Sequence, residues 1–218
     1  LGALALAVAA VAPASAQQKS VAVTAIVEHP ALDSVRDGVQ AALKEAGFEA
    51  GKNLQWQYQS AQGNTGTAAQ IARKFIGDKP DAIVAIATPS AQAVIAATKT
   101  VPVVFSAVTD PVAAKLVKDL KAPGGNVTGV SDRLPLAPQV DLMLKVVPTA
   151  KRVGIVYSPG EINSTILIKE LKAVLAQRGM TLVSAAAPRT VDVQAATKSL
   201  VGKVDLIYSS NLIDQDAI

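Results

Sequence analysis

Apolar strand patterns and amphipathic helix patterns alternate along almost the whole chain. The strand patterns lie at 21–27, 53–60, 82–87, 101–108, 127–130, 153–157, 181–186 and 205–209. The helix patterns lie at 31–46, 67–77, from residue 90, and at 113–121, 139–146, 162–178 and 192–202. Such alternation predicts an α/β fold, with a mainly parallel sheet that carries helices on both faces.

The alternation pauses around residue 132. The stretch "SDRLPLAPQ" contains two prolines and mixes polar with apolar residues. We therefore predict two Rossmann-like lobes with parallel sheets, one over 20–131 and one over 132–218. The last residues, "NLIDQDAI", begin a helix pattern. We expect the C-terminal part of the second lobe to be missing from this sequence.

The first sixteen residues predict part of a signal peptide. The stretch is uncharged, apolar as far as Val11, and ends in Ala14-Ser15-Ala16, which is an A-x-A cleavage pattern. It is shorter than the about 20 residues that a helix needs to cross a bilayer. We expect an exported, periplasmic protein. An apolar strand or helix of the fold itself is the alternative.

Composition excludes several functions. The net charge is +4, but the basic residues are scattered, so we expect no nucleic-acid partner. The chain has no cysteine and one histidine, His29, which excludes a thiolate metal site and a disulfide framework. No G-x-S-x-G or G-x-x-x-x-G-K-[ST] motif is present. We expect no cofactor, metal or catalytic residue, although paired carboxylates such as Glu28 with Asp110 or Glu161 leave acid–base chemistry open.

Polar residues follow five of the predicted strands. The strand ends read "AIVEHPALD", "AIATPSAQA", "SAVTDPVAA", "IVYSPGEINST" and "IYSSNLIDQ". Each one is a normal helix start, because Ser, Thr, Asp, Asn and Pro favour the first turn. In open parallel sheets, however, ligands bind outside the carboxyl ends of the strands. If the two lobes face each other, these loops form one cleft.

Several of these stretches resemble one family. The stretches that carry the resemblance are "VEHPALDSVRDGVQAALKEAGF", "ATPSAQA", "AVTDPVAA", "PGGNVTGVSD" and "VGIVYSPGEINS". They resemble the periplasmic substrate-binding proteins of ABC transporters, in the tryptophan/tyrosine-type group. The resemblance spans residues 20–211. It implies a monomeric protein with a type I periplasmic-binding-protein fold and without enzymatic activity. Such a protein closes on a small ligand and passes it to an inner-membrane permease.

The resemblance also implies roles for residues at the strand ends. An amino-acid ligand would place its carboxylate at the helix start formed by Thr88, Ser90 and Ala91, with free N–H groups on Ser90 and Ala91. Its ammonium group would bind Asp110, which follows Thr109, or Glu161. The remaining expected ligand-binding residues are His29, Asp33, Tyr157, Asn163, Ser164 and Asn211. Tyr157 and Tyr208 could stack on an aromatic ligand, or Tyr208 could point into the core.

Three functions therefore remain at this point. The first is an exported receptor for an amino acid, possibly an aromatic one. The second is an exported α/β hydrolase that uses carboxylates in the cleft. The third is the ligand-sensing domain of a signalling protein, such as one that feeds a membrane kinase. The effector domain of a transcriptional regulator shares the two-lobed fold, but it would need a DNA-binding helix-turn-helix where the export signal lies.

Overall fold

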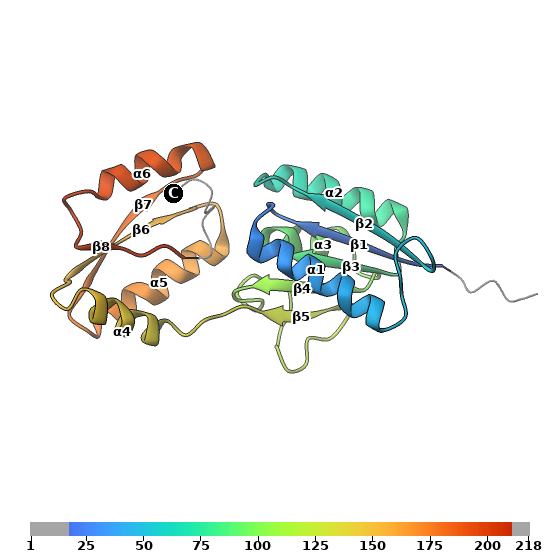
Figure 1. Cartoon of the computed structure of the whole chain (residues 1–218), viewed down its shortest axis with the longest axis horizontal. Coiled ribbons are helices and arrows are strands. Elements are labelled where there is room, and N and C mark those ends of the chain that lie inside the picture. Colours follow the sequence, from blue (N-terminus) through green and yellow to red (C-terminus); the bar gives the residue numbers. More distant parts are fainter. Residues whose placement is uncertain (1–17, 211–218) are drawn as a thin grey trace, which may run out of the picture.

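The computed structural model describes residues 18–210, which form two α/β lobes side by side (Figure 1). The expected signal peptide at 1–16 and the expected ligand residue Asn211 lie outside the described residues. Within residues 18–210, no helix combines the length and the apolar character needed to cross a bilayer.

The first lobe contains a five-stranded sheet in the order β2-β1-β3-β4-β5, and every neighbouring pair is parallel. Its strands are β1 (Lys19–Ala25), β2 (Leu54–Ser60), β3 (Ala82–Ile86), β4 (Val103–Val108) and β5 (Val127–Ser131). The strict alternation of residues 53–60 predicts an edge strand, and β2 is indeed at the edge.

Helices cover both faces of this sheet. Helix α1 (Pro30–Glu45) packs Leu32 and Val35 against a cluster that includes Val23 and Ile86. Helices α2 (Thr65–Asp78) and α3 (Thr88–Ala97) join the cluster on the opposite face, which includes Phe75. The sheet is therefore the middle of three layers, as the alternation predicts.

The second lobe repeats the arrangement with fewer strands. Its described sheet has the order β7-β6-β8, with β6 (Arg152–Tyr157), β7 (Thr181–Ala186) and β8 (Leu206–Ile207) all parallel. Helices α4 (Leu136–Val146) and α5 (Ile162–Ala176) pack into one cluster with β6. Helix α6 (Val193–Leu200), which follows the short 3-10 helix η1 (Thr190–Asp192), packs into another. The predicted α/β fold is confirmed, while the predicted lobe limits stay a prediction.

The helix predicted at 113–121 is wrong. The segment forms a turn as far as Lys115 and then irregular bends, and Lys115 takes a left-handed backbone conformation with φ of 60°. Its apolar residues Ala114, Leu116 and Val117 are buried in the first-lobe core, and Gln92 of α3 donates a hydrogen bond to the Ala114 carbonyl. Tertiary packing therefore fixes this segment and overrides its helical pattern.

The close approach of β4 and β5 depends on a glycine. Gly129 pairs with Phe105, and a Cβ at position 129 would lie 2.1 Å from the Phe105 carbonyl oxygen and 2.5 Å from the Phe105 ring. We expect Gly129→Ala to destabilise the protein by about 3 kcal/mol, because overpacking against a buried ring forces the two strands apart. Urea unfolding measures the effect.

Gly38→Ala is the matched control. Gly38 lies inside α1, with no atom within 4 Å of the added carbon. The helix preference for alanine should stabilise this variant by about 0.5–1 kcal/mol. Equal unfolding midpoints for the two variants would contradict the packing argument.

Candidate functional site

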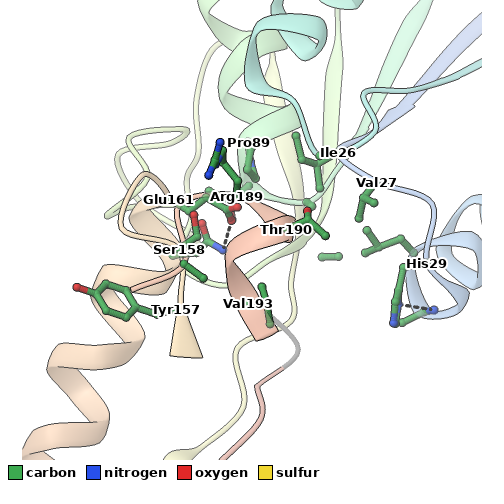
Figure 2. A pocket seen from close by; sticks show the side chains of 18 of the residues that line it. Ile26, Val27, His29, Pro89, Tyr157, Ser158, Glu161, Arg189, Thr190 and Val193 are labelled. Atoms are coloured by element: carbon green, nitrogen blue, oxygen red, sulfur yellow. Dashed lines mark hydrogen bonds between the residues drawn. The ribbon is translucent and has the colours of Figure 1, made fainter. Parts of the chain in front are cut away.

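A cavity of about 410 Å³ lies between the two lobes. Figure 2 shows side chains from both lobes around it. The lining residues of the first lobe and the linker are Ile26, Val27, His29, Ala31, Leu32, Val35, Gly63, Ala87, Thr88, Pro89, Ala107 and Asp132. Those of the second lobe are Tyr157, Ser158, Glu161, Asn163, Ala187, Pro188, Arg189, Thr190 and Val193.

The strand order explains the position of this cavity. In the first sheet the order reverses between β1 and β3, and in the second between β6 and β8. Loops that leave neighbouring strands at such a point diverge to opposite faces and open a crevice. The loops after β1 and β3 and those after β6 and β7 supply most of the lining.

The wall from the first lobe is the N-terminus of α3. Thr88 and Pro89 line the cavity, and Thr88 is buried. The first hydrogen bond of the helix runs from the Ala91 N–H to the Ala87 carbonyl at 3.0 Å, so the N–H groups of Thr88 and Ser90 precede the ladder. No acidic residue lies in the first turn. This helix end therefore offers positive potential to the cavity.

Two alanines at the cavity have unfavourable backbone conformations. Ala87, the residue that caps α3, has φ of 73° and ψ of 156°, a region that only glycine adopts readily. Ala107 has φ of 51° and lies where the register of β4 shifts against β5. Both residues end neighbouring strands and line the cavity. Strain of this kind is typical of functional sites.

The wall from the second lobe is rich in hydrogen-bond acceptors. Glu161 occupies the N-cap position of α5, and Asn163 donates from Nδ2 to Glu161 Oε2 at 3.3 Å. Asn163 is only 5% exposed, and its Oδ1 has no partner among the described residues. A buried acceptor without a donor is costly, so a ligand that donates a hydrogen bond would be favoured here.

Asp132 reaches the same cavity from the linker between the lobes. Burial raises the pKa of its carboxyl, and a hydrogen bond with the Thr109 side chain acts in the opposite direction. Asp132 is not among the residues predicted from the sequence, although it directly follows β5 (Val127–Ser131) as the other predicted residues follow their strands.

Arg189 and Thr190 were also missed. They follow the end of β7, which is not among the five strand ends from which the site was predicted. The Arg189 guanidinium donates to both carboxylate oxygens of Asp192, at 2.9 and 2.7 Å. These contacts raise the pKa of Arg189 and satisfy much of its charge.

The structure brings five of the predicted ligand residues to the cavity. They are His29, Thr88, Tyr157, Glu161 and Asn163. His29 caps α1, with Nδ1 accepting from the Ala31 N–H at 3.2 Å. The ring of Tyr157 extends away from the other labelled side chains in Figure 2, so stacking on a ligand stays a prediction.

Six predicted residues are not among the lining residues, and three of them make other contacts. Asp33 pairs with Arg36 at 2.9 Å. Asp110 pairs with Arg133 at 2.9 Å and accepts from the Ala113 N–H. The prediction of a free N–H on Ala91 is wrong, because α3 begins two residues earlier than expected. Ser90, Thr109 and Ser164 also lie outside the lining.

The second tyrosine considered for stacking lies elsewhere. Tyr208 packs with the cluster of α4 and α5, and its hydroxyl donates to Gln139 Oε1. Within residues 18–210, no group of three or more His, Asp or Glu residues is placed to hold a metal ion.

The chain was compared with known proteins. Residues 20–215 match the family described as ABC transporter substrate binding protein. A tyrosine-binding protein from Clostridioides difficile (strain R20291) is 41% identical over 201 residues, which are 91% of this chain and 58% of that protein. The chain therefore spans little more than half the length of this relative.

Solved structures are similar as well. An ABC domain from Streptococcus pneumonia in complex with L-Trp has 36% identity and a TM-score of 0.85, covering 90% of this chain and 67% of that one. The ligand-free, open structure of a substrate-binding protein with adhesive properties from Clostridium difficile has 43% identity and a TM-score of 0.63, covering 89% and 66%. A leucine-binding protein from Thermotoga maritima, at 19% identity and a TM-score of 0.64 over 87% of this chain and 55% of that one, shares the type I binding-protein fold.

The strain at Ala87 predicts a gain in stability on substitution. Ala87→Gly should stabilise the protein by about 1 kcal/mol, because relief of the strain exceeds the entropy cost of glycine. Ala85→Gly is the control, since Ala85 is fully buried in β3 and has ordinary strand geometry. That variant should lose about 1 kcal/mol or more. Loss of stability in both variants, measured by urea unfolding, would contradict the strain.

Proposed function

The chain belongs to the family of ABC transporter substrate-binding proteins, and from that premise we propose that it captures an aromatic amino acid between its two lobes. As an exported receptor it would then deliver this ligand from the periplasm to an ABC-type permease. The observation that carries the proposal is the charge pattern of the cavity. A helix N-terminus faces it from the first lobe, and acceptors face it from the second.

The carboxylate of the ligand would bind at the start of α3. The N–H groups of Thr88 and Ser90 precede the helix ladder, and the Thr88 side chain lies at the cavity wall. A carboxylate at this position gains both hydrogen bonds and the favourable end of the helix dipole. Arg189 is the weaker candidate for this role, because its guanidinium is already bound to Asp192.

The ammonium group of the ligand would bind the acceptors. Glu161 and Asp132 supply carboxylates, and Asn163 supplies its buried Oδ1. Together they replace Asp110 in this role, since Asp110 is paired with Arg133. Charge-assisted hydrogen bonds to a buried ammonium group are among the strongest that a protein can make.

The side chain of the ligand would lie against the apolar part of the cavity. Ile26, Val27, Leu32 and Val35 come from the first lobe, and Val193 comes from the second. These residues suit a large apolar side chain. The aromatic choice rests on the relatives, of which one is a tyrosine-binding protein and another was solved with L-Trp.

A hydrolase is the second candidate, because two carboxylates line one cavity. Burial raises the pKa of the Asp132 carboxyl, which favours a role as a general acid, and Glu161 supplies a second carboxylate. Incubation of the protein with peptide and ester derivatives of the bound ligand would decide between the two. Unchanged compounds support the receptor, and turnover that Asp132→Asn abolishes supports the enzyme.

Ligand binding is expected to raise the thermal midpoint. The protein is unfolded to remove carried ligand, refolded and heated with L-tryptophan, L-tyrosine, L-phenylalanine, L-leucine or 4-hydroxybenzoate. A ligand that binds only the folded state stabilises it by mass action. We expect the largest shifts with the aromatic amino acids. No shift with any amino acid would overturn the proposal.

Substitution of Glu161 should weaken this binding selectively. We expect Glu161→Gln to weaken the affinity about tenfold or more, because a hydrogen bond to a charged group is lost. Glu49→Gln is the matched control, since Glu49 is exposed and paired with Lys52 away from the cavity. Equal losses in both variants, measured by calorimetric titration, would remove Glu161 from the site.

The affinity should also fall at acidic pH. Burial raises the pKa of Asp132 above its ordinary 3.8 in the ligand-free protein. An ammonium group favours the ionised carboxylate and lowers this pKa, so the affinity is full above the raised pKa and is lost as the pH falls through it. Asp132→Asn should bind more weakly and lose this part of the pH dependence. An unchanged pH profile in this variant would contradict the assignment.

A further inference from the structure

Arg133 contacts one carboxylate from each lobe. The residue lies in the linker between β5 and α4, which crosses from one lobe to the other in Figure 1. Its Nη1 lies 2.9 Å from Asp110 Oδ2, in the turn after β4. Its Nη2 pairs with Glu170 Oε1, on α5 of the second lobe. We call this set of three residues the Arg133 bridge.

The first-lobe side of the bridge is held in place by further hydrogen bonds. Asp110 accepts the Ala113 N–H at its other oxygen, and its side chain is only 18% exposed. The Arg133 N–H donates to Ser131 Oγ, and the Ser131 hydroxyl donates to the Thr109 carbonyl at 3.0 Å. Arg133 is thus fixed to the first lobe, and its contact with Glu170 is the one that depends on the position of the second lobe.

The bridge is adjacent in sequence to the cavity. Asp132 lines the cavity, while Arg133, the next residue, is not among the lining residues. A ligand group that binds Asp132 therefore acts on the same short stretch of linker that carries the bridge. The side chain of Arg133 itself does not need to touch the ligand.

The chain superposes more closely on the L-Trp complex than on the ligand-free, open structure. The chain superposes on that complex with a TM-score of 0.85, and on the ligand-free, open structure with 0.63. Sequence identity does not explain this difference in TM-score, because identity is lower for the complex, at 36%, than for the open structure, at 43%. The Arg133 bridge is therefore a contact of an arrangement close to the ligand-bound one.

We propose that Arg133 is a positioning residue that holds the two lobes in the ligand-enclosing arrangement by binding Asp110 and Glu170 at once. The inference rests on the proposed function for its effect on ligand affinity. A single exposed ion pair contributes little, but a guanidinium shared by two carboxylates forms a network. Lysine cannot replace it well, because an ammonium group lacks the planar fork that reaches both partners.

Two variants break the bridge without touching the cavity. Arg133→Ala removes its centre, and Glu170→Gln removes the charge on the second lobe. Arg178→Ala is the matched control, because Arg178 pairs with Asp141 at 2.8 Å entirely within the second lobe. The radius of gyration of the ligand-free protein is measured by small-angle scattering, and L-tryptophan is titrated into each variant by calorimetry.

We expect Arg133→Ala and Glu170→Gln to have a larger radius of gyration than the wild type and to bind L-tryptophan about fivefold to tenfold more weakly. The ranking of L-tryptophan, L-tyrosine and L-leucine should stay as in the wild type, because no contact with the ligand is lost. Arg178→Ala should match the wild type in both measurements.

Wild-type values for both bridge variants would overturn the inference, as would equal effects of Arg178→Ala. A changed ligand ranking would also overturn it, since it would place Arg133 in contact with the ligand. If the wild type binds none of the amino acids, the proposed function fails. The scattering measurement needs no ligand and still decides whether the bridge sets the lobe arrangement.

Discussion

The direction of parallel strands governs the whole site. Each described strand pairs in parallel with its neighbours, so the strands of each sheet end at one edge. The loops that leave this edge lead into helices, and the helix N-termini gather there. With two such edges facing each other, α3 from the first lobe and α5 from the second meet at one cavity. Their end residues, rather than the helix dipoles alone, decide which charges the cavity accepts.

The two helix starts differ in a way that suits an amino acid. Helix α3 begins without an acidic residue, at a strained Ala87 that turns the chain sharply into the helix. Helix α5 (Ile162–Ala176) has Glu161 at its N-cap position, whose carboxylate brings negative charge to the cavity, and carries the buried acceptor of Asn163 in its first turn. One wall therefore accepts an anion, and the other accepts a donor or a cation. A ligand that carries both groups can join the lobes.

Much of the fold could be predicted from the sequence because its signals are local. The alternation at 53–60 specified an edge strand, and short apolar runs between helix patterns specified the buried strands. The segment 113–121 failed because Leu116 and Val117 pack into a distant core in a turn conformation. The strain at Ala87 could not be predicted either, because an alanine gives no sign of a positive φ and only the backbone angles show the strain.

The site was predicted in part for the same reason. Glu161 and Asn163 follow directly after a strand, so their place at the edge could be predicted. Asp110 occupies an equivalent position, but Arg133, which is 23 residues away, takes its carboxylate. Pairing of this kind depends on how the linker crosses between the lobes. No local pattern encodes it. Asp132 differs in this respect, because it directly follows a strand and its place at the sheet edge could be predicted.

The central claim is that one zwitterionic ligand spans both walls of the cavity. The most direct test is to titrate the stripped, refolded protein with L-tryptophan, with tryptamine, which lacks the carboxylate, and with indole-3-propionate, which lacks the ammonium group. The account predicts that L-tryptophan binds about tenfold to a hundredfold more tightly than either analogue, since each charge-assisted contact contributes about 1.5–3 kcal/mol. Equal binding of tryptamine would contradict the role of α3, and equal binding of indole-3-propionate would contradict the role of the acceptors.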